Sequence, residues 1–504
     1  MFAALESALS LALAWENLVG VVAGVVLGVS FGALPGVTGY GGIALGLPFT
    51  FFMPTVPAMA FLLGIYKGGM FGGAISAITF GVPGEPSSAP TVFDGFPLAK
   101  KGKPYTALNT ALYSSIAGNL LADLAVIFTF APMGVLSLKF GPRELFALMF
   151  VCLATLVIFM EGRIIKAIIG TMIGFFLATI GPDPIMNYPR LGFGIPELEA
   201  GIGLTPFVVG LFALSEMLIQ FSESLAARGK GWQLETTEDL RQLIRDPSPS
   251  DRFSVRDWFT TTWRETLLGS GVGIFLGALP GPGGTMSAFT AYALAGRLSK
   301  NRGRMGTGIP EGVAAPEAAD SATVGPSLIP LFAFGIPGSA TAGLFMGAFM
   351  LQGIAPGPGL FTDYMDIMLA IFMIMLAGTV ANLVISKVVM IPVFARLGLI
   401  DARILIPVLM PLMILGMYAI DNRPFDVLIM VGAGLLGLLL QRLEISLAPT
   451  VVAYIIGPML EKHFRRGLIL SGGSVTYWFA SPIALGLYIV GIVASVLLLR
   501  RKKT

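Results

Sequence analysis

The sequence predicts an all-α polytopic membrane protein with roughly 10–12 transmembrane helices in two inverted repeats, each with a broken helix or a re-entrant hairpin. The first observation is composition: the 504-residue chain is 55% hydrophobic and only 12% charged, with a mean hydropathy of +0.83. The second is a set of apolar stretches close to the length of about 20 residues that crosses a bilayer. The third is a repeat, because the sequence Gly-Ala-Leu-Pro-Gly at residues 32–36 recurs unchanged at residues 277–281.

In chain order, each uninterrupted apolar stretch predicts one membrane-spanning helix. These stretches are residues 18–34, 145–160, 164–181, 202–221, 366–386, 403–421, 424–440 and 477–499. Other stretches are apolar but interrupted, and they are residues 43–63, 106–131, 327–352 and 444–460. Segments 43–63 and 69–90 are expected to be either full crossings or re-entrant hairpins.

A polar stretch at residues 222–265 divides the chain into a first membrane repeat at residues 1–221 and a second at residues 266–460. Residues 461–504 are expected to form a C-terminal loop and the last transmembrane helix. The polar stretch is rich in Lys and Arg, which favours a cytoplasmic linker. Residues 1–17 contain no Lys or Arg, so the first repeat is expected to enter the membrane from outside and the second from the cytoplasm. This opposite entry is the pattern of an inverted-topology repeat.

The repeated Gly-Ala-Leu-Pro-Gly interrupts an apolar segment in each half, at residues 32–42 and 277–287. Pro removes a backbone donor and Gly permits unusual backbone geometry, so each segment predicts a break in a helix. Carbonyl groups freed at such a break can coordinate a cation. A packing kink without a ligand is the alternative, and the duplication favours a binding site. We expect the coupling ion, Na⁺ or H⁺, at Gly32, Pro35, Gly36, Thr38, Gly277, Pro280, Gly281, Gly283, Thr285 and the acidic Glu317.

A second pair of Pro-Gly breaks follows in the same order, at residues 81–91 and 335–341. Small hydroxyl residues follow each break, so a hairpin tip would present amide and hydroxyl donors to a carboxylate. An ordinary surface turn is the alternative reading of Pro-Gly, and the apolar flanks favour a tip at membrane depth. We expect substrate contacts at Gly84, Ser87, Ser88, Thr91, Gly338, Ser339 and Thr341.

Lys67, Glu317 and Asp320 are ionisable residues in apolar surroundings, and intramembrane charges indicate a functional site by default. Lys67 and Asp320 fall at neighbouring positions of the two repeats. We expect each to contact substrate or to pair with the other; a structural salt bridge or a Lys reaching the membrane surface is the alternative. Asn119 and Asp123 are four residues apart and share one helix face, which favours an interhelical hydrogen bond.

Several function classes are disfavoured by composition and motif content. One Cys and one His exclude a disulfide within the chain and make a Cys/His metal site implausible. A net charge of +3 gives no argument for nucleic acid. The Gly-rich runs do not follow the P-loop pattern, so ATP hydrolysis by this chain is not expected. A membrane enzyme would need convergent acids or bases, and a passive channel would need a continuous polar lining; neither fits the sequence.

The motifs together resemble the large membrane subunit (TctA-type) of the tripartite tricarboxylate transporter family. The matching pieces are GALPGVTG at residues 32–39, the segment from GIYKGGMFGG to PLAKKG at 64–102, GALPGPGG at 277–284, EGVAAPEAADSA at 311–322, and the segment from IPLFAFGIPGS to GPGLF at 329–361. The resemblance covers nearly the whole chain.

This resemblance implies ion-coupled secondary uptake of a small organic carboxylate, a tricarboxylate or dicarboxylate, across the inner membrane. It implies two partners, a small membrane subunit (TctB-type) and a periplasmic solute-binding protein (TctC-type) that delivers the substrate. It also implies an elevator-type movement of a transport domain against a scaffold. No cofactor is expected beyond Na⁺ as a coupling ion.

Overall fold

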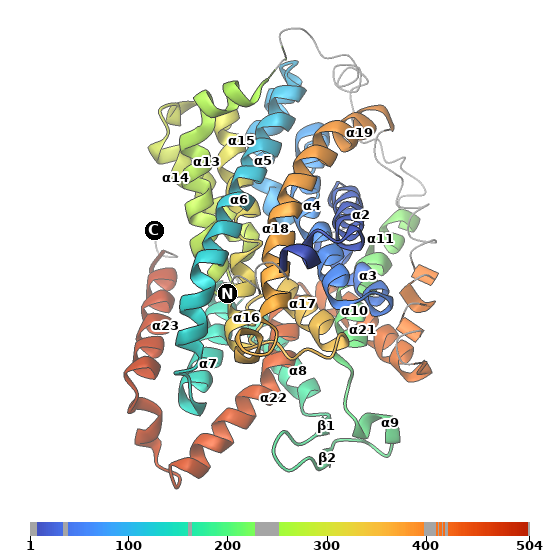
Figure 1. Cartoon of the computed structure of the whole chain (residues 1–504), viewed down its shortest axis with the longest axis vertical. Helices are drawn as coiled ribbons and strands as arrows, with labels where there is room; N and C mark the ends of the chain where they lie inside the picture. Colours follow the sequence, from blue (N-terminus) through green and yellow to red (C-terminus); the bar gives the residue numbers. More distant parts are fainter. Residues whose placement is uncertain are drawn as a thin grey trace.

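The computed structural model describes residues 8–33, 39–159, 164–226, 251, 253–397 and 422–501, with 410, 411, 413–415, 417 and 418. This part of the chain is almost entirely helical and contains a single two-residue β pair (Figure 1). An all-α protein was predicted from the sequence, and the fold confirms it.

The first half consists of α2 (Trp15–Gly32), α3 (Gly39–Gly46), η1 (Leu47–Phe52), α4 (Thr55–Phe80), η2 (Pro86–Ser88), α5 (Ala89–Lys100), α6 (Pro104–Ser137), α7 (Pro142–Phe159) and α8 (Ile164–Ala178). The antiparallel strands β1 (Gly181–Pro182) and β2 (Pro189–Arg190) then precede α9 (Pro196–Glu199), α10 (Leu204–Val209), the π-helical η3 (Gly210–Leu214) and α11 (Ser215–Ala226).

The second half consists of α13 (Val255–Ala278), α14 (Gly283–Leu298), η6 (Arg302–Arg304), α15 (Pro310–Ser321), η7 (Pro326–Leu328), α16 (Ile329–Phe334), α17 (Ala340–Leu351), η8 (Pro358–Phe361), α18 (Met365–Ile385), the π-helical η9 (Ser386–Met390) and α19 (Ile391–Leu397). It ends with α21 (Pro424–Arg442), α22 (Leu447–Leu470), η10 (Val475–Phe479) and α23 (Pro482–Arg501).

Local sequence explains where several of these helices start and stop. Ser254 and Asp257 form a reciprocal capping box at the start of α13. Gly81 follows α4 and Gly335 follows α16, both in the left-handed conformation with φ of 67° and 68°. Only Gly adopts this conformation readily, so both Pro-Gly motifs end a helix by the same backbone device.

Five helical segments are long and apolar enough to cross a bilayer, within the described residues. They are α2, α4, α6, the continuous helix from α18 into α19, and α21. Shorter apolar helices accompany them, at Gly41–Phe52, Ile164–Ala178, Leu204–Ile219, Ala340–Leu351 and Pro482–Val493. The molecule is therefore a multi-pass membrane protein, and the number of crossings remains a prediction.

Two predicted divisions of the chain differ from the fold. The sequence predicted separate segments at 43–63 and 69–90. In the structure, one helix, α4, runs without interruption from Thr55 to Phe80 and contains parts of both. The loop expected from residue 461 begins only after α22 ends at Leu470, so His463 is helical. Most of the stretch at 403–421 lies outside the described residues.

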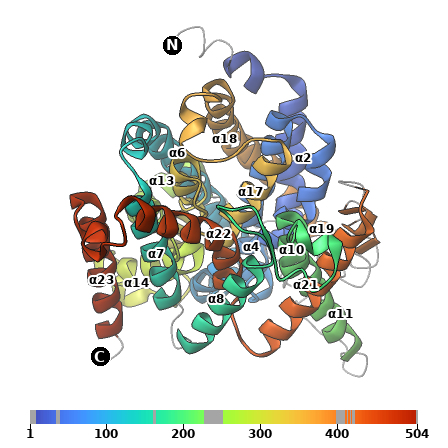
Figure 2. The same cartoon turned by 90° about the horizontal axis from the view of Figure 1, so that it is seen from below.

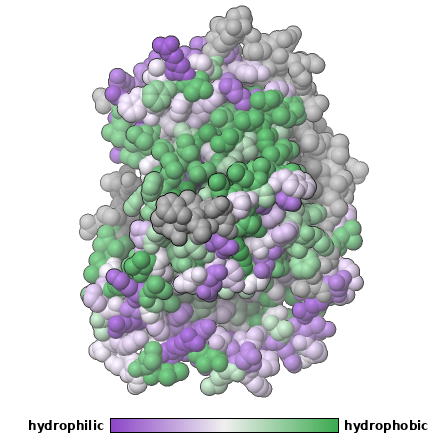
Figure 3. Space-filling model, viewed as in Figure 1, coloured by the Kyte–Doolittle hydropathy of each residue, from purple (hydrophilic) through white to green (hydrophobic). Residues whose placement is uncertain are grey.

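The outer surface carries the apolar residues that a bilayer would cover. Hydrophobic residues dominate the middle and upper part of one face, and hydrophilic residues gather at its top and bottom edges (Figure 3). Viewed from below, α22 lies near the centre of the molecule (Figure 2), where it contacts α7, α8 and α17.

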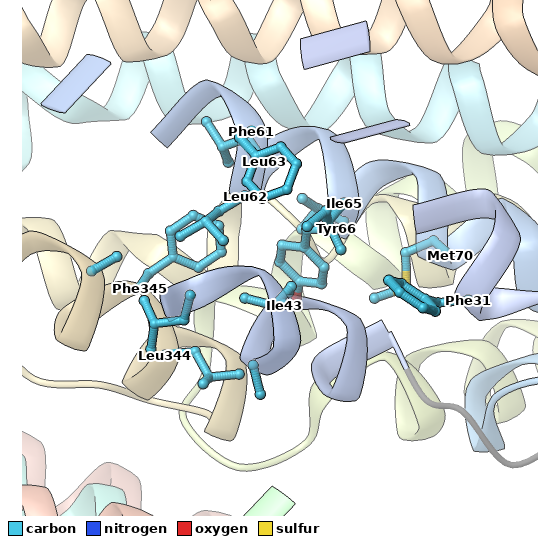
Figure 4. Close-up of a cluster of buried hydrophobic side chains, with 14 of the residues drawn as sticks. Phe31, Ile43, Phe61, Leu62, Leu63, Ile65, Tyr66, Met70, Leu344 and Phe345 are labelled. Carbon is cyan, nitrogen blue, oxygen red and sulfur yellow. The ribbon is translucent and has the colours of Figure 1, made fainter. Parts of the chain in front are cut away.

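The core joins α2, α3, α4 and α17. Phe31, Ile43, Ile65 and Phe345 are buried there around Tyr66, whose ring centroid lies 6.1 Å from that of Phe345 (Figure 4). The tyrosine hydroxyl leaves this apolar cluster and lies 3.4 Å from the hydroxyl of Ser327. Tyr66 therefore connects the core with a polar region beside it.

The two halves share one pattern of helix contact. Gly24, Gly28 and Gly32 of α2 approach α4 so closely that an added Cβ would lie 2.2–2.3 Å from a backbone carbonyl oxygen. Their repeat equivalents Gly269, Gly273 and Gly277 approach α15 and the residues after it, where the added Cβ would lie 2.2, 2.2 and 2.8 Å from backbone atoms. Small residues let membrane helices pack this closely. The sequence repeat therefore corresponds to a repeated helix pair.

Candidate substrate and ion site

A cavity of about 440 Å³ lies where the second-half break meets both Pro-Gly tips. Its polar wall is formed by Glu85–Ser87, Gly281–Thr285, Asp320 and Gly338–Thr341. Other lining residues come from η3, α11 and the chain from the end of α21 into α22, including Phe212, Gln441 and Ser446. Ligand cavities for small molecules span about 300–1,000 Å³, so this volume suits a small organic molecule.

The second-half break is held by defined contacts. The helix stops at Ala278, and α14 starts at Gly283, with Gly281 and Gly283 both at positive φ. The Gly281 amide donates to the Gly338 carbonyl at 3.1 Å, and the Thr155 hydroxyl donates to the Pro280 carbonyl at 3.2 Å. The Pro280 carbonyl, which was expected to coordinate an ion, thus already accepts a hydrogen bond.

Each tip packs against the break of its own half. A Cβ on Gly84 would lie 2.0 Å from the Gly32 carbonyl oxygen, and one on Gly338 would lie 3.3 Å from the Pro280 Cα. In the second half, Ser339 caps α17 by accepting a hydrogen bond from the Ala342 amide at 3.1 Å. The starts of α14 and α17 therefore face one cavity, and helix N-termini favour anions.

Lys67 lies elsewhere, and the expected Lys67–Asp320 pair is not formed. Its ammonium contacts both carboxylate oxygens of Asp123, at 2.9 and 2.8 Å, the Thr379 hydroxyl at 3.0 Å and the side-chain Oδ1 of Asn119 at 3.3 Å. The expectation failed because a buried cation takes the best oxygen ligands within reach, and α6 provides them. The interhelical hydrogen bonding predicted for Asn119 and Asp123 is confirmed.

Glu317 forms its own buried network behind the cavity wall. Its carboxylate accepts hydrogen bonds from Thr91 at 2.5 Å and Ser115 at 3.2 Å. Neither Thr91 nor Glu317 lines the cavity, and each already has a polar partner. Ser88 is also buried away from the cavity, and its hydroxyl makes no hydrogen bond among the described residues.

The structure thus divides the predicted site residues into three groups. Those that line the cavity are Ser87, Asp320, Gly338, Ser339, Thr341, Gly281, Gly283 and Thr285. Those that lie outside its lining are Gly32, Lys67, Gly84, Ser88, Thr91, Gly277, Pro280 and Glu317. Pro35, Gly36 and Thr38 lie outside the described residues.

Glu85 is a cavity residue that sequence reasoning missed. It is only 2% exposed, and its Oε1 makes no hydrogen bond within the described part of the chain. It lies inside the Gly-Val-Pro-Gly-Glu-Pro motif, where its charge between two helix-breaking residues was a usable signal. Asp320 is a second buried carboxylate in the cavity lining. It is 1% exposed, and its Oδ1 also makes no hydrogen bond within the described residues.

The charged side chains of the described cavity lining are all acidic. The described lining residues include the carboxylates of Glu85, Glu216 and Asp320, and no Lys or Arg. Burying a charged carboxylate without a compensating charge costs roughly several kcal/mol of desolvation free energy, even after the surroundings relax. The described lining therefore offers a carboxylate helix N-termini and hydroxyls, and no basic side chain.

A helical membrane protein with a repeated helix pair and a polar cavity at a helix break has the architecture of a membrane carrier. Residues 18–452 match the Tripartite tricarboxylate transporter TctA family. The chain therefore belongs to this family and is a component of a transporter, not an enzyme. The family's systems are tripartite, which implies a small membrane subunit and a solute-binding protein as partners in general.

Two relatives come from Agrobacterium vitis. The chain is 35% identical over 486 residues, 96% of its own length and 93% of the relative's, to an uncharacterized 52.8 kDa protein in the TAR-I ttuC' 3'region. It is 38% identical over 227 residues, 45% of its own length and 93% of the relative's, to an uncharacterized protein in the TAR-II ttuC' 3'region. No solved structure matches the chain.

Proposed function

We propose that this chain is the translocating subunit of an ion-driven uptake system that moves a small organic carboxylate across the inner membrane. A tricarboxylate or a dicarboxylate is the substrate class, and a periplasmic binding protein delivers it. The observation that carries the proposal is the cavity of about 440 Å³ lined by the second-half break and both tips. Its place at the helix breaks is where secondary transporters bind substrate.

The substrate carboxylate is held by the starts of α14 and α17. Ser339, Thr341 and Thr285 supply hydroxyls there, and the Gly-rich backbone of 281–284 allows close approach. Oriented amides and hydroxyls bind an anion without a basic side chain. The negative cavity wall at Glu85 and Asp320 then requires a cation to bind with the substrate.

The two repeats are proposed to have inverted topology, and the movement is proposed to be elevator-type. Two observations support this: the repeated glycine contacts of α2–α4 and α13–α15, and a cavity lined both by the tips with the second-half break and by η3, α11, α21 and α22. The two tips and the second-half break would move together and carry the substrate past η3, α21 and α22. A Cys pair at Thr285 and Ser446, in a variant with Cys152→Ser, would stop uptake on cross-linking; uninterrupted uptake in the cross-linked protein would contradict the movement.

Uptake by proteoliposomes containing the chain, its small membrane subunit and the binding protein tests the function. A radiolabelled carboxylate is expected to accumulate when a Na⁺ or proton gradient is imposed, without ATP. Thr285→Val, which removes one cavity hydroxyl at nearly constant volume, is expected to raise the half-saturating substrate concentration. Thr260→Val, an exposed position on α13, is the matched control. Uptake that ignores both gradients would contradict the proposal.

A further inference from the structure

We infer that Glu85, Ser87 and Asp320 form a sodium site in the cavity wall, and that Na⁺ must bind there before the substrate does. The inference rests on the proposed function, and it assigns the coupling ion to residues other than the expected helix-break carbonyls and Glu317. Its basis is a set of oxygen ligands that converge from two halves of the chain.

The first step is geometric. Glu85, Ser87 and Asp320 all line the same cavity. Ser87 is a close neighbour of both carboxyl groups. Carboxylate and hydroxyl oxygens are the ligands that hard cations prefer.

The second step is the unused bonding capacity of these side chains. Glu85 Oε1 and Asp320 Oδ1 are buried in residues only 2% and 1% exposed, and neither accepts a hydrogen bond within the described residues. Buried polar atoms almost always have a partner, so two such oxygens on one cavity wall point to a ligand. Glu317, by contrast, has both carboxylate oxygens engaged by Thr91 and Ser115.

The third step is the room that the backbone leaves for these oxygens. A Cβ on Gly39, at the start of α3, would lie 2.2 Å from Glu85 Oε1, and one on Gly284, in the first turn of α14, would lie 2.1 Å from Asp320 Oδ1. Gly39 and Gly284 are as far apart in sequence as Gly32 and Gly277, so they are equivalent positions of the repeat. Both halves therefore place a carboxylate oxygen against the glycine at this repeat position.

The fourth step is charge. The described lining offers no Lys or Arg to neutralise these carboxylates, and Lys67 is fully buried against Asp123 and Thr379. An anionic substrate would meet like charge in this wall, which raises its electrostatic energy. A bound Na⁺ neutralises one of the two carboxylate charges and so lowers that repulsion. The substrate therefore binds well only with the cation in place, and the two bind cooperatively.

Thermal unfolding of the purified full-length chain in detergent tests the site independently of transport. A ligand that binds the folded state raises the unfolding temperature with its concentration. We expect NaCl, exchanged against choline chloride at constant ionic strength, to stabilise the wild-type chain. Asp320→Asn and Glu85→Gln are each expected to raise the half-saturating Na⁺ concentration by about tenfold or more. Asp366→Asn, an exposed position at the start of α18, is expected to respond as wild type.

A second pair of variants leaves every charge in place. Gly284→Ala introduces a Cβ that would meet Asp320 Oδ1, whereas Gly296→Ala on the same helix meets nothing within 4 Å. Only Gly284→Ala is expected to weaken the sodium response. If Asp320→Asn, Glu85→Gln and Gly284→Ala all fold and respond as wild type, the assignment is wrong.

Proteoliposome uptake separates failure of this site from failure of the proposed function. The wild-type system is expected to show a half-saturating substrate concentration that falls as Na⁺ rises, and Asp320→Asn is expected to lose this dependence. Uptake driven by a proton gradient and indifferent to Na⁺ would overturn the sodium site and leave the transport function standing. No uptake under either gradient, with Na⁺ binding intact, would overturn the function alone.

Discussion

Lys67 donates hydrogen bonds to both carboxylate oxygens of Asp123, at 2.9 and 2.8 Å, and neither side chain is exposed. Thr379 joins the pair by donating to Asp123 at 2.8 Å, and Asn382 donates to the Lys67 backbone carbonyl at 3.0 Å. The network thereby connects α4, α6 and α18, which come from both halves of the chain. Such a network is costly to break because each charge is buried with the other.

Removing one charge of this pair is expected to destabilise the fold severely. Lys67→Met leaves Asp123 buried without a cation, and the expected loss is about 3–5 kcal/mol of unfolding free energy. The double variant Lys67→Met with Asp123→Leu is expected to recover most of that loss, since it removes both charges. Thermal unfolding in detergent measures the three proteins. A single variant as stable as the double would show that the pair is not coupled.

The glycine contacts between α13 and α15 are expected to be sensitive to one added methyl group. In Gly273→Ala the Cβ would lie 2.2 Å from the Ala319 carbonyl oxygen, so the two helices must separate, at a cost of about 1–3 kcal/mol. Gly271→Ala lies two residues away on the same helix, with nothing within 4 Å of the added Cβ, and should not destabilise. Unfolding temperatures of the two variants make the comparison; equal values would contradict close packing at Gly273.

Local sequence could predict the parts of this molecule that depend on short motifs. The repeated Gly-Ala-Leu-Pro-Gly and the two Pro-Gly tips located the helix breaks, and the second-half break and both tips lie on the cavity. The shared face of Asn119 and Asp123 gave the interhelical hydrogen bonding of α6. These inferences work because helix geometry and Pro or Gly chemistry act over a few residues.

The partners of individual charges could not be predicted, because they depend on which helices pack together. Lys67 and Asp320 fall at neighbouring repeat positions, yet the approach of α6 and α18 gives Lys67 three oxygen-bearing partners instead. Glu85 was missed for a related reason. Its significance comes from Asp320 in the same cavity wall and from Gly39 against its carboxylate, and both are remote or inconspicuous in sequence.

Asp94 of α5 is expected to hold the chain between α14 and α15 in place. Its carboxylate accepts hydrogen bonds from the amides of Gly306, Gly308 and Ile309 and from the Tyr292 hydroxyl, all at 2.8–3.1 Å. Asp94→Asn replaces one accepting carboxylate oxygen by an NH2 group, which cannot accept from the N–H and O–H donors that face it. It also removes the charge, and hydrogen bonds to a charged group contribute about 1.5–3 kcal/mol each.

The loss of stability should grow with the number of hydrogen bonds to Asp94 that a variant removes. Asp94→Asn is expected to lose several times more stability in thermal unfolding than Tyr292→Phe, which removes one of the four hydrogen bonds. Limited proteolysis should show faster cleavage between residues 299 and 309 in Asp94→Asn only. Equal effects of the two variants would mean that the backbone amides do not depend on the carboxylate.

The hairpin that contains β1 and β2 is expected to loosen in acid. Asp183 accepts hydrogen bonds from the Met186 and Ile185 amides, at 2.8 and 2.9 Å, and from the Arg465 guanidinium at 2.6 Å. These donors, the Met186 amide first, hold the pKa of the Asp183 carboxyl well below its usual range. Arg190 and Glu461 complete the charged cluster, with Arg190 3.6 Å from Asp183 and 2.9 Å from Glu461.

The sign of the pH effect follows from that direction. A carboxyl whose folded pKa is lowered contributes stability above its unfolded pKa of about 3.9, and this contribution is lost as pH falls further. We therefore expect proteolytic cleavage within residues 181–201 to accelerate below about pH 4 in the wild-type protein, measured with an acid-active protease. Asp183→Asn should cleave faster than wild type already at about pH 5 and lose most of the acceleration, whereas Glu197→Gln, exposed on α9, should follow wild type. A wild-type cleavage rate that does not change across this range would show that the Asp183 contacts do not hold the hairpin.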